Sequence, residues 1–188
     1  LPPQSPRSSC GNLGFACASE VLMILDIKKY PDPVLQRQAD PVQDITEEVR
    51  GLAQDMVETM YEKQGIGLAA PQVGHSCRLI TVDVSGPDAR SDLNVLINPQ
   101  IVEHEGETEH EEGCLSLPEF TGKTKRSTRV VVRGLDLEGR SQCIEAEGLL
   151  AICLQHEIDH LQGTLLLDRA GRLKRTMYEK KVRKWHRS

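Results

Sequence analysis

The run His156-Glu157-Ile158-Asp159-His160 places two imidazoles four residues apart in a segment with helical periodicity. Residues four apart lie on one face of a helix, so both imidazoles can bind a single metal ion. Glu157 is about 100° around such a helix from His156 and about 60° from His160. Its carboxylate can therefore reach a water on that ion without being a ligand. This is the position of a general base in metal-assisted hydrolysis.

A solvated helix face that carries two histidines is the alternative interpretation. Aliphatic residues surround the motif, namely Leu149, Leu150, Ile152, Leu154, Ile158 and Leu161. They predict a helix over about 149–162 that is buried on most sides and ends at Gly163. Buried ionisable groups need a partner or a function, which favours the metal site.

The third ligand must come from another segment. Cys153 projects from the same face as the histidines, but 153 to 160 spans about 10.5 Å, too far for metal bonds of about 2.0–2.3 Å. We expect Cys153 to form an apolar pocket wall instead. The remaining candidates are His75, His104, His110 and Cys114. Cys114 is mildly favoured, because glycine and proline around it predict a bent, fixed loop that can present a thiolate.

The elements that must position these groups form one α+β domain. A helix is predicted over 45–63, with Asp44 as N-cap and Glu47 as its capping-box partner. The segment 65–74 breaks that helix with three glycines and a proline. Strands are predicted over 77–84 and 94–103, a hairpin over 129–148, and a basic helix over 172–186. Five alternating glutamates, Glu103 to Glu111, are expected on one solvated face.

Composition excludes two classes of protein. The 188 residues include only six aromatic ones, which argues against a nucleic-acid binder that stacks bases. The longest aliphatic stretch, Leu149 to Leu154, is too short to cross a bilayer. The net charge is −5, but residues 172–188 carry +7, which leaves −12 on the rest. Any contact with a polyanion is therefore expected through this tail.

Three regions are expected along the chain. Residues 1–22 form a disordered or expression-derived leader, with a trimmed organelle-targeting remnant as the alternative. Residues 23–170 form the catalytic domain, and 171–188 form the basic C-terminal helix. The six cysteines include no Cys-x-x-Cys pair, which favours a reducing cytosol.

Three segments together resemble peptide deformylase of the bacterial type, over roughly Ile24 to Arg169. They are GIGLAAPQ at 65–72, EGCLS at 112–116 and QHEIDH at 155–160. The resemblance implies an α+β fold with mixed or antiparallel sheets around a central metal-binding helix, followed by a C-terminal helix. It implies removal of formate from the N-formyl-methionine of nascent chains. The residue at 121 is Thr, where some relatives place a basic residue near the substrate entrance.

By motif match, Cys114, His156 and His160 would hold one divalent ion, with Fe(II) as the native metal and Zn(II), Ni(II) or Co(II) as substitutes. Glu157 would be the general base and acid. The Gln72 side chain and the Leu115 backbone N–H would stabilise the oxyanion.

The resemblance also implies how the substrate binds. The peptide would add as a strand to Ile66 and Gly67, beside Glu112 and Gly113. Its methionine would enter a pocket formed by Ile66, Leu149, Cys153 and the ring of His156, with His110 near by. Asp159 would have a structural role, anchoring backbone or an arginine.

Beyond the nascent peptide, the expected partner is the ribosome, bound through 172–188. We expect a monomer, without a membrane partner, in the bacterial cytoplasm, or in an organelle if 1–20 is a targeting remnant. Two rival functions remain. One is a zinc peptidase, whose third ligand would lie downstream of the helix. The other is a non-catalytic ribosome-binding metal module, which would need four protein ligands.

Overall fold

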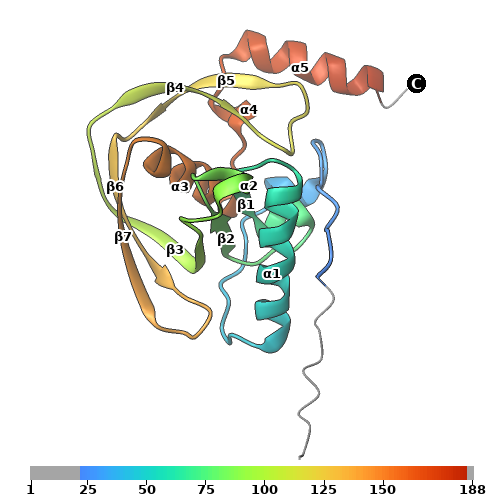
Figure 1. Ribbon diagram of the computed structural model, residues 1–188. Coiled ribbons are helices and arrows are strands. Elements are labelled where there is room, and N and C mark those ends of the chain that lie inside the picture. The colour runs from blue at the N-terminus through green and yellow to red at the C-terminus, as the bar shows by residue number, and fades with distance from the viewer. Residues whose placement is uncertain (1–21, 186–188) are drawn as a thin grey trace, which may run out of the picture.

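A computed structural model describes residues 22–185, so the expected leader lies outside the described residues apart from Leu22. The main sheet has five strands, and each neighbouring pair is antiparallel. Their order is β1 (Gly67–Ala69), β2 (Leu79–Val82), β3 (Asn94–Glu105), β6 (Arg129–Leu135) and β7 (Ser141–Glu147). A second, two-stranded antiparallel sheet pairs β4 (Thr108–Gly113) with β5 (Thr121–Arg126) (Figure 1).

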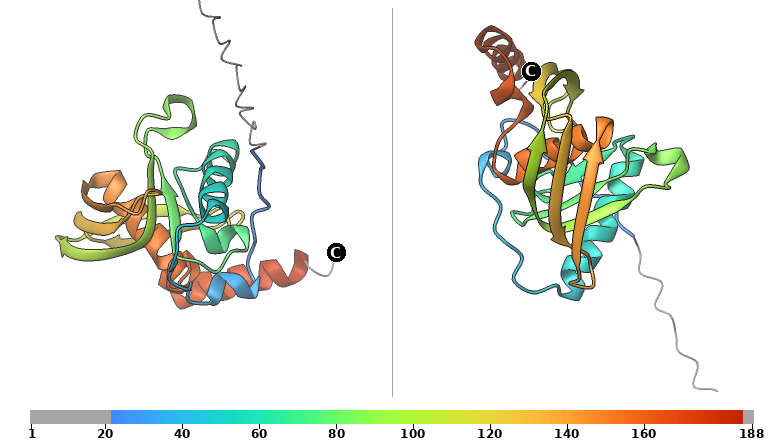
Figure 2. Two further views of the ribbon diagram at one scale, coloured as in Figure 1. Left: turned by 90° about the horizontal axis from the view of Figure 1, so that it is seen from below. Right: turned by 90° about the vertical axis from the view of Figure 1, so that its left-hand side faces the viewer.

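Two longer helices pack on opposite sides of the β1–β2 end of the main sheet. These are α1 (Glu47–Glu62) and α3 (Gly148–Leu161). The shorter helices are η1 (Pro33–Gln36), η2 (Ala70–Val73), α2 (Gly86–Ala89) and α4 (Leu166–Arg169). The last helix, α5 (Arg172–Trp185), runs along the outside of the molecule, next to the chain near residue 30 (Figure 2).

Strand β2 shows how the sequence builds this layering. All four of its residues are buried, and successive side chains point to opposite faces of the sheet. Leu79 belongs to the core cluster that contains Met56 and Met60 of α1. Ile80 and Val82 belong to the cluster that contains Leu154 and Ile158 of α3. One strand therefore separates two apolar cores and fixes α3 on the face opposite α1.

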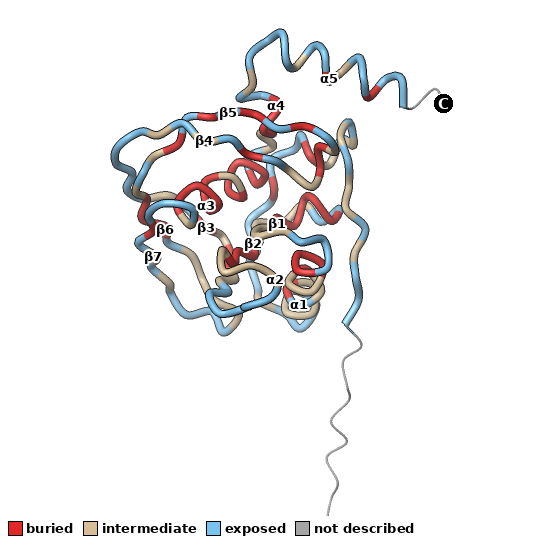
Figure 3. Tube along the Cα trace, turned by 45° about the horizontal axis from the view of Figure 1, so that its top comes forward, coloured by how far each residue is buried: buried red, intermediate tan, exposed pale blue. Residues whose placement is uncertain are grey.

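Helix α3 lies inside the molecule, as its aliphatic composition predicts (Figure 3). Every residue from Ala151 to Leu161 is buried except His156, which is half-buried. The helix ends at Leu161 with Gln162 as its C-cap, and Gly163 follows with φ +71°, as expected for C′.

Helix α5 is amphipathic. Tyr178 and Val182 pack into a third core cluster with Phe120 and Leu166, while most of the helix surface is exposed (Figure 3). Among the helices within residues 22–185, none is long and apolar enough to cross a membrane. Residue 186, which was expected to end this helix, lies outside the described residues.

Two sequence-based details need correction. The N-cap of α1 is Thr46, whose hydroxyl accepts from Val49 N at 3.4 Å, and not Asp44. Thr46 has an extended backbone with φ −80° and ψ 169°, so the helix begins only at Glu47. The five glutamates are all exposed as predicted, but they do not lie on one extended segment. Gly106, with φ +68°, separates β3 from β4 between them.

Candidate active site

Three side chains converge between α3 and the loop after β4. The metal-binding atoms of Cys114, His156 and His160 all lie within 4.8 Å of one another. Cys114 Sγ is 3.3 Å from His160 Nε2. In a tetrahedral zinc site, sulfur and nitrogen ligands are separated by about 3.6 Å, given their usual bond lengths. The spacing therefore fits a single ion. Within residues 22–185, His75, His104 and His110 are not part of this cluster.

The Glu112 carboxylate orients the first of these histidines. Glu112 Oε2 lies 2.7 Å from His156 Nδ1, which leaves Nε2 for the cluster. Arg126 donates to both oxygens of Glu112, at 2.7 and 2.9 Å, and the Thr124 hydroxyl donates to Oε1. Burial alone would raise the pKa of Glu112, but hydrogen bonds from His156, Arg126 and Thr124 outweigh it and hold the pKa well below its ordinary value. Such a carboxylate–histidine pair is usual behind a metal ligand.

Asp159 continues this network on the far side of α3. Its Oδ2 accepts from Arg126 Nη1 at 2.6 Å and from Arg169 Nε at 2.7 Å, and its Oδ1 accepts from Arg169 Nη2 at 2.5 Å. The motif's second acid thus binds two arginines, in agreement with the structural role predicted for it.

Glu157 is a buried carboxylate, and one of its oxygens has no hydrogen-bond partner within the described residues. It is 4% exposed, and burial raises its pKa to about 7. Within the described part of the chain, the buried side-chain atoms without a hydrogen-bond partner are Glu157 Oε2 and His160 Nδ1. An unpaired buried carboxylate oxygen beside a cysteine sulfur and two imidazoles calls for an explanation. A divalent ion and its water would supply one, so the residues present fit a metal site.

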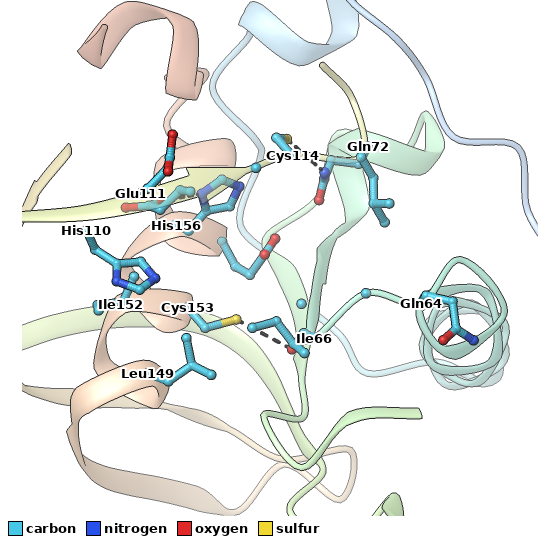
Figure 4. Close-up of a pocket in the computed structure, with 16 residues that line it drawn as sticks. Gln64, Ile66, Gln72, His110, Glu111, Cys114, Leu149, Ile152, Cys153 and His156 are labelled. Atoms are coloured by element: carbon cyan, nitrogen blue, oxygen red, sulfur yellow. Dashed lines mark hydrogen bonds and ion pairs between the residues drawn. The ribbon is translucent and has the colours of Figure 1, made fainter. Parts of the chain in front are cut away.

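The Gln72 side chain is held with its amide nitrogen toward Cys114. Its Oε1 accepts from Ala69 N at 2.8 Å, which fixes the amide orientation. Its Nε2 lies 3.3 Å from Ser116 Oγ. The same nitrogen lies 3.6 Å from Cys114 Sγ (Figure 4). A donor is therefore fixed at the edge of the cluster.

The cluster opens into a cavity of about 440 Å³. In Figure 4, Leu149 and Cys153 lie beside Ile66, and Cys153 Sγ donates to Ile66 O at 3.4 Å. Burial raises the pKa of the Cys153 thiol, as suits an apolar wall. Every predicted site residue lines this cavity except His160, which is 1% exposed in the cluster. The lining includes Ile66, Gly67, Gln72, His110, Glu112, Gly113, Cys114, Leu115, Leu149, Cys153, His156 and Glu157.

Sequence reasoning did not identify several residues of this site. Gln64, Glu111 and Ile152 also line the cavity, and Ser116 holds Gln72. Arg126 was missed because KTKR at 123–126 has the composition of a solvated strand. Exposed and buried residues in fact alternate along β5, which turns Thr124 and Arg126 inward. The available signal was Asp159, for which an arginine partner was expected without a position.

Comparison with known proteins agrees with this geometry. Residues 24–176 match the family model of polypeptide deformylase. A peptide deformylase of Thermodesulfovibrio yellowstonii is 54% identical over 162 residues, covering 86% of this chain and 98% of its own. A peptide deformylase of Syntrophobacter fumaroxidans is 52% identical, covering 87% of this chain and 96% of its own.

Solved structures give the same result. A peptide deformylase from Legionella pneumophila superposes with a TM-score of 0.82 at 44% identity, covering 87% of this chain and 96% of its own. One from Ehrlichia chaffeensis in complex with actinonin has a TM-score of 0.81 at 38% identity, covering 88% and 99%. The α+β fold predicted from the sequence is thereby confirmed. This chain belongs to the polypeptide deformylase family, the metal-dependent hydrolases that remove the N-formyl group from nascent peptides.

Proposed function

We propose that Cys114, His156 and His160 hold the divalent ion of this deformylase. The ligand distances, and the Glu112 carboxylate behind His156 Nδ1, support this assignment. We assign Fe(II) as the native metal, as the family resemblance implies. One thiolate with two imidazoles also suits Zn(II), Ni(II) and Co(II).

The observation that carries the mechanism is the unpaired, buried Glu157 Oε2 beside this cluster. A divalent ion held there would supply the Lewis acidity that makes water a nucleophile near neutral pH. Glu157 accepts the proton of the attacking water and delivers it to the departing amine. The Gln72 amide, held by Ala69 N, and the Leu115 backbone N–H donate to the developing oxyanion.

The substrate binds along β1 in this proposal. Within the described residues, strand β1 is an edge of the main sheet and pairs with β2 alone, so a peptide can add at Ile66 and Gly67. Its methionine side chain enters the cavity between Ile66, Leu149 and Cys153, which is apolar in most of its lining. Glu112 and Gly113 also line this cavity.

The two rival functions fit less well. A zinc peptidase would take its third ligand downstream of the helix, whereas here the thiolate of Cys114 comes from upstream. A structural metal module would close the ion with a fourth protein ligand, and the cluster within residues 22–185 has three.

Partners and location follow from charge and substrate. We propose that the exposed basic face of α5 contacts ribosomal RNA, which places the monomeric enzyme near emerging chains in the bacterial cytoplasm. The +7 charge of residues 172–188 supports this.

The decisive experiment compares the wild-type chain with Glu157→Gln, each loaded with Ni(II). Formate release from a formyl-Met-Ala-Ser peptide is measured together with bound metal. We expect a loss of about 10²–10⁴-fold in kcat with metal content unchanged, because the substitution removes only the base. Activity within about threefold of wild type would exclude Glu157 as the base. No formate release by the fully loaded wild type would exclude the deformylase assignment.

A further inference from the structure

A chain of buried charges starts at the proposed metal ligand His156 and ends at the surface. From His156 it passes to Glu112 on β4, then to Arg126 on β5, returns to Asp159 on α3, and ends at Arg169 on α4. Glu112, Arg126 and Asp159 are 7%, 4% and 8% exposed. Each link is at most 2.9 Å long. The Arg169 side chain is 39% exposed, so this series of linked charged groups reaches solvent at Arg169.

Arg126 is shared between two carboxylates. It uses Nε and Nη2 for Glu112 and Nη1 for Asp159. With Arg169 present, two arginines balance two acids. Without Arg169, Asp159 would lose two hydrogen bonds and would have one buried cation left to satisfy it. A buried charge that has lost its partner is costly, so Asp159 would compete with Glu112 for Arg126.

We propose that Arg169 is a positioning residue for the metal site. By satisfying Asp159, it lets Arg126 stay bidentate on Glu112, and Glu112 then holds the His156 ring with Nε2 toward the ion. Arg169 itself touches neither metal nor substrate. The inference rests on the proposed metal site and adds a residue from outside α3 and the three sequence motifs.

The structure offers a matched control in Arg175. This residue also ties α4 to neighbouring charges, with ion pairs to Asp168 at 2.8 Å and Glu179 at 2.9 Å. Its side chain is 41% exposed, close to the value for Arg169. Within residues 22–185 it forms no hydrogen bond or ion pair with Asp159, so Arg175→Ala loosens the same region and leaves the network intact.

The test measures metal loss from the Co(II)-loaded enzyme. Excess chelator is added, and decay of the thiolate-to-cobalt absorption gives the dissociation rate without any assay of activity. We expect Arg169→Ala to lose metal about 3- to 10-fold faster than wild type, below the 10- to 100-fold typical of a direct partner of a ligand. Arg169→Lys keeps the charge but not the bidentate geometry, so its rate is intermediate. Arg175→Ala keeps the wild-type rate.

A double-mutant cycle tests whether Arg169 acts on the metal site through Glu112. If Arg169 acts through Glu112, adding Arg169→Ala to Glu112→Gln causes no further acceleration. The same acceleration in both backgrounds would overturn the proposal, because Arg169 would then act independently of Glu112. A wild-type rate for Arg169→Ala, or equal effects of Arg169→Ala and Arg175→Ala, would also overturn it. A wild-type chain that gives no thiolate–cobalt absorption would overturn the proposed metal site itself.

Discussion

Gly67 lies where β1, the proposed substrate-binding edge, meets Glu157, the proposed base. A Cβ on this residue would lie within 3 Å of Cys153 Sγ and of the Glu157 carboxylate. The absence of a side chain therefore lets β1 pass directly over α3. The sequence shows Gly67 as part of a loop that breaks a helix, and this contact gives it a second role.

We expect Gly67→Ala to lower kcat/KM by about 10- to 100-fold, because a shift of about 1 Å in a catalytic group has an effect of this size. Formate release by the metal-loaded variant measures it. Gly51→Ala on α1 is the matched control, since a Cβ there meets nothing within 4 Å. That variant should keep full activity and gain about 0.5–1 kcal/mol in stability. Unchanged activity of Gly67→Ala would show that β1 and Glu157 can move apart freely.

Between elements, the junction of α1, β2 and α2 depends on one buried carboxylate. Asp83 follows β2 and is fully buried. Its Oδ2 accepts from the Tyr61 hydroxyl at 2.7 Å, and its Oδ1 accepts from Ser85 N and Oγ at 2.9 and 2.6 Å. Burial alone would raise the pKa of Asp83, but the hydrogen bonds from Ser85 and Tyr61 outweigh it and hold the pKa below its ordinary value.

A lowered native pKa has a defined effect on stability. The contribution of Asp83 is fully present above the unfolded pKa and is lost as pH falls through the lower native pKa. We expect Asp83→Asn to cost about 1–3 kcal/mol of unfolding free energy at pH 7. The difference from wild type should shrink below about pH 4. Urea unfolding from pH 3 to 7 measures it, and a difference that does not change with pH would refute the charge-based explanation.

For the whole molecule, charge is divided between an acidic body and a basic helix. Arg172 and Lys180 are exposed on α5 and have no ion pair within the described residues. They can be neutralised without breaking the cluster that Tyr178 and Val182 form with Phe120.

If α5 binds ribosomal RNA, the double variant Arg172→Ala/Lys180→Ala should weaken ribosome binding. It should reduce the slope of log K against log salt by about 1.5 to 2, while kcat/KM on a short formyl peptide stays unchanged. Arg37→Ala/Lys63→Ala, which removes two exposed charges from the body, is the control. Equal effects of both double variants would place the contact elsewhere.

Local patterns determined much of this protein. Periods of 3.6 or 2 residues and the chemistry of turns predict helix α3 with Gly163 after its end, the hairpin of β6 and β7, and the paired imidazoles. The three sequence motifs indicated the protein family, and the family indicated the activity. These features depend on residues that are close in the sequence, so a single amino-acid sequence is enough to predict them.

Tertiary structure decided what joins distant segments. The residues alone left four candidates for the third ligand, and Cys114 meets His160 from 46 residues away. The Arg126 side chain points inward because it forms ion pairs with Glu112 and Asp159, and neither acid is its neighbour in the sequence. Arg169 reaches Asp159 only because the chain turns back after α3. A buried charge is positioned by its partners, and local periodicity contains no information about partners that come from other elements.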